Sequence, residues 1–111
     1  SHVRTLTRTG LLDGVPVEYV SASGKLPGII RGASYICGCQ SCNYTKVIVN
    51  GYEFERHAGC KRSHPISHIR FPSGRSIFQV VQMLNKETTV PFETIQAFIG
   101  FPINEQAYSD W

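Results

Sequence analysis

Residues 37–60 read CGCQSCNYTKVIVNGYEFERHAGC, and this stretch decides how the chain folds. It holds all four cysteines of the 111-residue chain, and His57 lies near its far end. Thiols gathered in this way indicate a disulfide framework, a catalytic thiol or a metal site. A framework fits poorly because Cys37 and Cys39 are too close to bridge easily. A catalytic thiol fits poorly because no nucleophile signature surrounds these cysteines, although His57 could serve as the base.

A metal site explains the pattern best. Cys39 and Cys42 form a CxxC pair, and His57 and Cys60 form an HxxC pair; these ligand types and spacings are typical of structural Zn²⁺. We expect the CxxC pair on a tight turn after a strand, and the HxxC pair on one face of a helix end. One closed, tetrahedral Zn²⁺ site would then join this helix to a sheet. Cys37 and Cys60 compete for the fourth position, and the alternative without metal is that the thiols are buried and reduced.

The same stretch predicts a helix between the two halves of the metal site. Asn50 is a good N-cap residue, and Glu53, three residues later, completes a capping-box pattern. Gly59 is a typical C-terminal stop, so we expect the helix over residues 51–58. The β-branched residues within 45–49 predict a short strand directly before it.

The rest of the chain predicts strands in its first half and helices in its second. Alternating apolar residues and turn signals predict strands at 15–21 and 67–71, one or two strands within 28–37 with a break near Gly32, and a turn at 23–28. Apolar stripes and capping residues predict helices at 3–8, 76–84, 90–99 and after Asn104. The fold class is therefore α+β, in a single domain that spans residues 1–111, of which Ser1 and His2 resemble a cloning remnant.

Positive charge is concentrated in the middle of the chain. The formal net charge is +3, and no acidic residue lies between Arg56 and Arg75. Cations that share one loop-and-strand surface would contact phosphates of double-stranded DNA with a steep salt dependence; the simpler alternative is a solvated charged face. The candidate DNA-contacting residues are Arg56, Lys61, Arg62, His64, His68, Arg70 and Arg75.

The C-terminal part carries more apolar residues than one core face requires. Phe92, Ile95 and Ile99 fall on one stripe of the predicted helix, whereas Phe98 falls off it. An apolar groove between the last helices could receive a helical segment of a partner protein, although most such residues in a small domain form the core. The residues concerned are Phe92, Ile95, Phe98, Ile99, Phe101, Ile103 and Trp111.

Other functional classes find no support in the sequence. No segment approaches the ~18 apolar residues of a membrane helix, and residues 1–10 lack the apolar core of a signal peptide. Paired carboxylates at useful spacing, a phosphate loop and a catalytic triad are not recognisable. We therefore expect a protein that is not an enzyme and has neither a membrane partner nor a small-molecule substrate.

Two longer stretches carry a family resemblance. They are GLLDGVPVEYV at residues 10–20 and ASYICGCQSCNYTKVIVNGYEFERHAGCKRSHPISHIRFPSGRSIFQVVQML at residues 33–84, with CGCxxCN and YEFERHAG as the specific motifs. From about Thr9 to Trp111 the chain resembles the Tify-domain-binding domain, a module of plant nuclear PHD-finger proteins, many with an acetyltransferase-like domain. The resemblance implies a nuclear location and a place in chromatin and transcription regulation.

That family is in turn similar to the SAND domain, an α/β DNA-binding fold of chromatin regulators. The shared pattern is Glu53–Glu55, Ala58–Gly59, His68–Arg70 and Gly74, whereas the Lys-Asp-Trp-Lys motif of DNA-binding SAND domains is replaced by SHPIS at residues 63–67.

The resemblance favours Cys37 over Cys60 as fourth ligand and implies a small SAND-like domain whose helix is fixed by zinc. We expect a zinc-stabilised module that contacts DNA through residues 56–75, or that binds a Tify-type or other short segment of a nuclear protein through its C-terminal helices.

Overall fold

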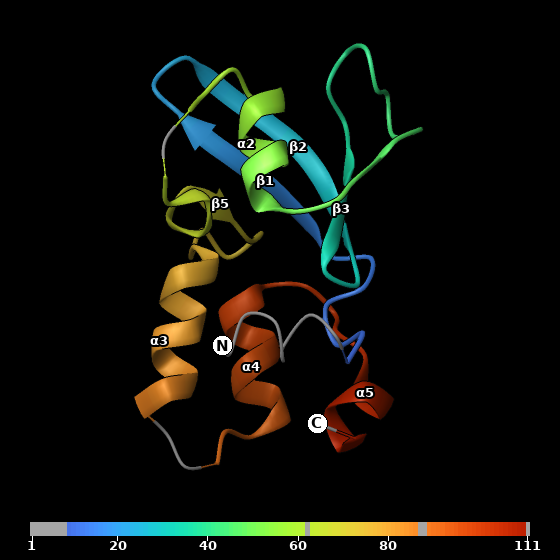
Figure 1. Ribbon diagram of the computed structural model, residues 1–111. Helices are drawn as coiled ribbons and strands as arrows, with labels where there is room; N and C mark the ends of the chain where they lie inside the picture. Colours follow the sequence, from blue (N-terminus) through green and yellow to red (C-terminus); the bar gives the residue numbers. More distant parts are fainter. Residues whose placement is uncertain (1–8, 62, 87–88, 111) are drawn as a thin grey trace.

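The computed structural model describes residues 9–61, 63–86 and 89–110, which form an antiparallel sheet with helices across one face and beyond one end (Figure 1). Within these residues the sheet has five strands in the order β4-β3-β2-β1-β5. The strands are β1 (Pro16–Ser21), β2 (Gly24–Arg31), β3 (Ser34–Cys37), β4 (Val47–Ile48) and β5 (Ile69–Arg70). The helices are α2 (Gly51–His57), the 3₁₀ turn η1 (Pro65–Ser67), α3 (Ile77–Lys86), α4 (Phe92–Ile99) and α5 (Glu105–Asp110). The predicted α+β class is confirmed.

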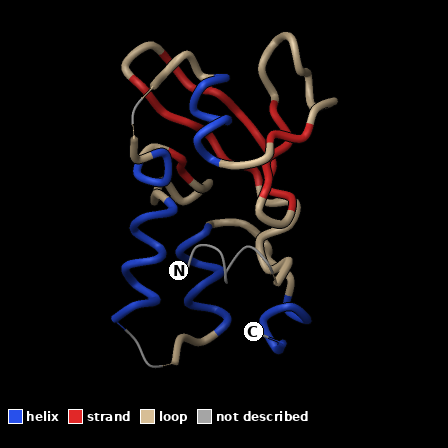
Figure 2. Tube along the Cα trace, in the orientation of Figure 1, coloured by secondary structure: helices blue, strands red, loops and turns tan. Residues whose placement is uncertain are grey.

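The two faces of the sheet have different surroundings. Side chains alternate between the faces along each strand, so the strand registers assign every residue to one face. One face packs under α2 and carries the buried residues Val17, Tyr19, Leu26, Ile30, Tyr35, Ile48 and Ile69. The opposite face, here called the open face, carries Pro16, Glu18, Lys25, Pro27, Ile29, Ile36, Val47 and Arg70. None of the described helices lies across the open face (Figure 2).

Phe54 packs α2 against the sheet. Its side chain is fully buried, and its ring stacks on that of Tyr35 with centroids 5.0 Å apart and planes 5° apart. The ring also lies directly over Gly28 of β2, where an added Cβ would stand 2.7 Å from Phe54 Cζ. The missing side chain at Gly28 is what lets the helix approach the strand this closely.

Both ends of α2 are capped at the predicted residues, but the Glu53 carboxylate pairs with Arg56 and does not complete the predicted capping box. The Asn50 side chain accepts a hydrogen bond of 2.9 Å from the Glu53 N–H, while the Glu53 carboxylate accepts one from Arg56. At the other end Gly59 has φ +81°, and the Gly59 and Cys60 N–H groups donate to the carbonyls of Arg56 and Glu55. These two bonds form a Schellman motif, which reverses the chain after the helix.

Glu55 of α2 is a buried carboxylate that points toward the sheet. It is 1% exposed, and it accepts a hydrogen bond of 2.6 Å from the Tyr19 hydroxyl of β1. Burial, followed by the neighbouring Glu55, raises the pKa of Tyr19 well above its usual value, so the phenol stays protonated as a donor. This contact fastens α2 to β1 at a second point beside Phe54.

The C-terminal helices lie side by side beyond one end of the sheet (Figure 1). Ser76 and Gln79 cap α3 reciprocally, since each side chain accepts a hydrogen bond from the other residue's N–H. The predicted stripe of α3 faces the core, and Asn104 caps α5 through the Ala107 N–H at 3.1 Å. No helix in the described ranges is both long and apolar enough to cross a bilayer.

Two sequence-based element predictions are wrong in extent. The predicted turn at 23–28 lies mostly within β2, and of the predicted strand at 67–71 the residues Ile69–Arg70 form β5. Pro27 is tolerated within β2 because the pairing with β3 ends at Cys37, next to it. There the Gly38 N–H donates to the Pro27 carbonyl, and no donor is required of Pro27. The predicted helix at 3–8 lies outside the described residues.

Gly28→Val is expected to lower the free energy of unfolding by about 1–3 kcal/mol, because the added side chain displaces the Phe54 ring. Chemical denaturation measures this, with Lys25→Ala, an exposed change on the same strand, as the control. Equal stability of Gly28→Val and the unmodified chain would contradict the close approach of Phe54.

Candidate metal centre

Three thiols and one imidazole converge where the end of β3 meets the end of α2. Cys37 is the last residue of β3, Cys39 and Cys42 lie on the following turn, and His57 is the last residue of α2. The sulfurs of Cys37, Cys39 and Cys42 lie 3.5, 3.9 and 3.5 Å from His57 Nδ1. All four ligand atoms are within 4.8 Å of one another.

These separations fit one tetrahedral Zn²⁺ ion. A sulfur about 2.3 Å and a nitrogen about 2.0 Å from such an ion lie about 3.5 Å apart. The three sulfur–nitrogen distances agree with this value to within a few tenths of an ångström. The donor set of three cysteines and one histidine is also one that structural zinc sites use. Residues and geometry therefore fit the ion that the sequence predicts.

The segment 37–45, here called the cysteine turn, is shaped around its own sulfurs. The N–H groups of Cys39 and Cys42 point at the sulfurs of Cys37 and Cys39, at 3.4 and 3.3 Å. Such contacts orient metal ligands and offset the charge of a thiolate. The turn closes through two successive residues in the left-handed region, Asn43 at φ +47° and Tyr44 at φ +64°.

The Tyr44 ring packs back onto the start of the cysteine turn, a contact that the sequence did not indicate. An added Cβ on Gly38 would stand 2.5 Å from the Tyr44 ring, so the ring lies on the backbone of Gly38. The signal for this contact was the glycine between Cys37 and Cys39. Its steric role emerges only once the turn is folded.

The thiols of the cluster differ in their readiness to ionise. Burial raises the pKa of Cys37 to about 12. Hydrogen bonds from the Ser41 hydroxyl and then His57 lower that of Cys39 to about 5. Cys39 therefore loses its proton more readily than Cys37, whose buried thiolate a bound cation would stabilise.

Cys60 lies apart from the cluster. The predicted HxxC pairing places His57 and Cys60 on one face of a helix end, but α2 ends at His57 and Gly59, the predicted stop, reverses the chain before residue 60. The Cys60 N–H therefore bonds to the Glu55 carbonyl, and its thiol lies beside the Tyr19 hydroxyl. In this structure the fourth position of the candidate site belongs to Cys37.

The basic residues of segment 56–75 are spread over both sides of the sheet. Arg56, on the outer side of α2, pairs with Glu53 at 2.8 Å, whereas Arg70 lies on the open face. The Arg75 guanidinium lies 4.2 Å from the centre of the Phe98 ring, and the His68 ring lies 5.6 Å from that of Tyr19. Lys61 and His64 are exposed, and Arg62 lies outside the described residues. Among the described cations of this segment, Arg56 and Lys61 line one pocket, whereas Arg70 lies on the other side of the sheet.

A groove lies at the C-terminal helices, but of the described residues predicted to form it only Phe98 lines it. Ile95 and Ile99 are fully buried in the core. Phe92 is half-buried against the ring of Tyr108, and Ile103 is also half-buried. Phe101 is 39% exposed, and Trp111 lies outside the described residues. A groove of about 380 Å³ is lined by Met83, Thr89, Val90, Pro91, Thr94 and Phe98.

Comparison with known proteins assigns the family. Residues 28–84, just over half of the chain, match the Tify domain binding domain, and this range contains the cysteine turn, α2 and most of α3. Searches of curated proteins and of solved structures gave no match. The resemblance seen in the sequence is thereby confirmed at the level of the family: the chain belongs to the Tify domain binding domain family.

Proposed function

We propose that this chain is a non-catalytic interaction module that binds a Tify-domain protein and is stabilised by one structural Zn²⁺ ion. Family membership is the observation that supports the partner, because the family is described by this binding. The cluster of Cys37, Cys39, Cys42 and His57 supports the ion.

The proposed Zn²⁺ has a structural rather than a catalytic role. Four protein ligands fill a tetrahedral shell and leave no position for a substrate. When bound, the ion supplies the positive charge that favours all three thiolates over thiols. The chain supplies the geometry, since β3 and α2 bring the cysteine turn and His57 together from opposite ends of the segment 37–57.

The family resemblance also motivates a proposal about the setting of the module. We place it in the nucleus of a plant cell, as part of a chromatin or transcription regulator, with a fold related to the SAND domain. A Tify-domain protein would reach it there as a nuclear partner.

The matched range indicates where the partner binds. Residues 28–84 include the second half of β2, β3 to β5, α2 and most of α3, but they leave out β1 and end before α4 begins at Phe92. A binding surface that the family shares is therefore expected on the sheet side of the molecule. We accordingly favour this part over the C-terminal helices that the apolar pattern alone suggested.

DNA contact through residues 56–75 is the second function that the sequence predicts, and it has less support. Arg56 and Arg70 lie on opposite sides of the sheet, and Arg56 is already paired with Glu53. Exposed Lys61 and His64 remain the better candidates, since both lie in the segment between α2 and η1 and neither has a carboxylate partner among the described residues.

The purified domain is expected to carry one zinc ion per chain. His57→Ala and Cys42→Ser should lose the ion and, because folding and binding are coupled, lower the free energy of unfolding by on the order of 5 kcal/mol. Native mass spectrometry and chemical denaturation measure both effects. Cys60→Ser is the matched control and should keep the ion; a loss of zinc in this variant would contradict the assignment of Cys37.

The zinc-loaded domain is expected to bind a recombinant Tify domain with a Kd of about 1 μM or tighter, as specific modules of this size do. Isothermal titration calorimetry measures the affinity, and removal of zinc with a chelator should weaken it. The control is an unrelated acidic protein of similar size. Absence of binding by a folded, zinc-loaded domain would refute the proposed function.

For DNA, we expect at most weak binding. It should disappear as salt is raised from about 50 to about 200 mM, because phosphate contacts weaken steeply over this range. An electrophoretic titration on duplex DNA tests this, with Lys61→Glu as the variant and Glu105→Lys as the opposite change. Tight binding that withstands salt and is lost in Lys61→Glu would restore DNA contact as the main function.

A further inference from the structure

The open face carries an apolar row that runs straight across four strands. Pro16 pairs with Ile29, Ile29 with Ile36, and Ile36 with Val47, so the four side chains are direct neighbours. Strands lie about 4.8 Å apart, and the row therefore spans about 14 Å. Neighbours of this kind on a face without a helix form a continuous apolar strip.

This strip is only partly covered. Val47 is 54% exposed, and Pro16, Ile29 and Ile36 are half-buried, in contrast to the residues under α2. A groove of about 480 Å³ lies at one end of it, within the size range of binding sites. The groove is lined by Pro16, Val17, Glu18, Pro27, Gly28, Ile29, Tyr44, Arg70, Phe71 and Pro72. An apolar groove of this size is typical of an interaction surface.

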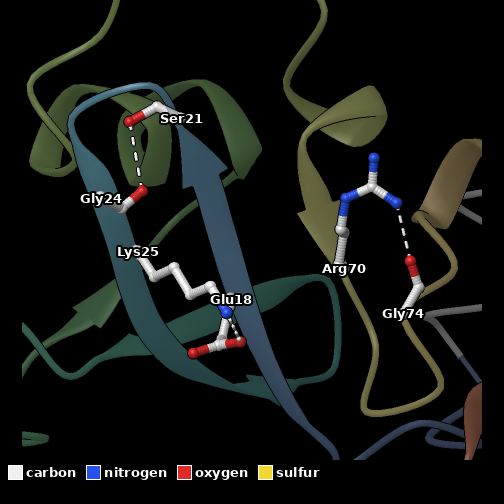
Figure 3. A network of polar contacts seen from close by, with 6 residues as sticks. All are labelled: Glu18, Ser21, Gly24, Lys25, Arg70 and Gly74. Atoms are coloured by element: carbon white, nitrogen blue, oxygen red, sulfur yellow. Dashed lines mark hydrogen bonds and ion pairs between the residues drawn. The ribbon is translucent and has the colours of Figure 1, made fainter.

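The groove contains one charged side chain, that of Arg70, that is not paired with a carboxylate of the described residues. Glu18 and Arg70 are cross-strand partners, yet their side chains turn away from each other (Figure 3). Glu18 turns to Lys25 at 4.0 Å, and the Arg70 guanidinium donates to the Gly74 carbonyl at 2.7 Å. Within residues 9–61, 63–86 and 89–110, no carboxylate lies within 4.0 Å of Arg70. A guanidinium has five N–H donors, so most of those of Arg70 remain for a ligand.

We propose that the open face is the docking surface for the Tify-domain partner, and that its occupant is an apolar segment carrying a carboxylate that pairs with Arg70. This inference rests on the proposed function and adds its location and chemistry. The apolar row takes the hydrophobic side chains of the segment, and Arg70 beside it selects an acidic residue. Gly28, Ile29, Ile36, Tyr44, Val47 and Arg70 all lie within the residues that match the family.

The cysteine turn connects this surface to the metal centre. Its sulfurs face α2, while the Tyr44 ring from the same turn lines the groove of the open face. The ring is 48% exposed, and Asn43 and Tyr44 hold left-handed backbone that the surrounding turn must fix. Loss of the metal would free the turn, so the position of Tyr44 and partner binding depend on the cluster.

The experiment titrates zinc-loaded variants with a recombinant Tify domain by calorimetry. Val47→Asp and Arg70→Glu should each weaken binding about tenfold or more, because one places a charge on the apolar row and the other repels the carboxylate. Tyr52→Asp is the matched control: Tyr52 is 56% exposed on α2, across the sheet from the open face. It should bind within about twofold of the unmodified domain. Zinc content and melting temperature verify that each variant is folded.

A charge exchange tests the carboxylate. Acidic residues of the Tify domain are changed to lysine one at a time, and one of these variants should bind Arg70→Glu better than it binds the unmodified domain. The inference is overturned if the unmodified domain binds and Val47→Asp and Arg70→Glu bind equally well. It is also overturned if sedimentation shows that the unmodified domain is a dimer and that Val47→Asp is a monomer. The open face would then bind a second copy of this chain. If the unmodified domain binds no Tify domain, the proposed function itself fails.

Discussion

The meeting of three cysteines of one turn with His57 of α2 is the contact on which the rest of this structure depends. α2 has seven residues, too few for a helix to be stable by itself in water. It is held by what its side chains reach: Phe54 lies on the bare backbone of Gly28, and Glu55 bonds to Tyr19. His57 adds a third anchor at the end of the helix, where its Nδ1 faces all three sulfurs. These anchors on nearby residues fix both the tilt and the rotation of a very short helix.

The cysteine turn acts on both sides of the sheet. One of its sides presents sulfurs to α2, and the other places the Tyr44 ring over Gly38 and at the groove of the open face. A chain of 111 residues buries a modest core, so the proposed Zn²⁺ cross-link would have a large effect on stability. The same cross-link would then determine whether the exposed surface keeps one shape, which is what a binding surface requires.

Local signals predicted much of this fold. The cap at Asn50, the stop at Gly59 and the cap at Asn104 each depend on a few adjacent residues, and each formed as expected. Spacing alone left Cys37 and Cys60 open, because a predicted stop at Gly59 does not say where the reversed chain places the Cys60 thiol, which lies beside Tyr19. The apolar row of the open face could not be predicted. Its members Pro16, Ile29, Ile36 and Val47 become neighbours only through the pairing of four strands.

The distribution of charge shows the same difference between the linear chain and the folded surface. Along the sequence, Arg56 and Arg70 belong to one acid-free run; in the fold, the sheet separates them. Binding to DNA needs several cations that track one line of phosphates, whereas recognition of a peptide can use one cation beside an apolar strip. Arg70 is such a single cation beside apolar residues, since it lines one groove with Ile29, Phe71 and Pro72. The Arg70 guanidinium would discriminate between apolar segments that carry a carboxylate and those that do not. A segment without a carboxylate would bury the guanidinium without a partner, which is energetically costly.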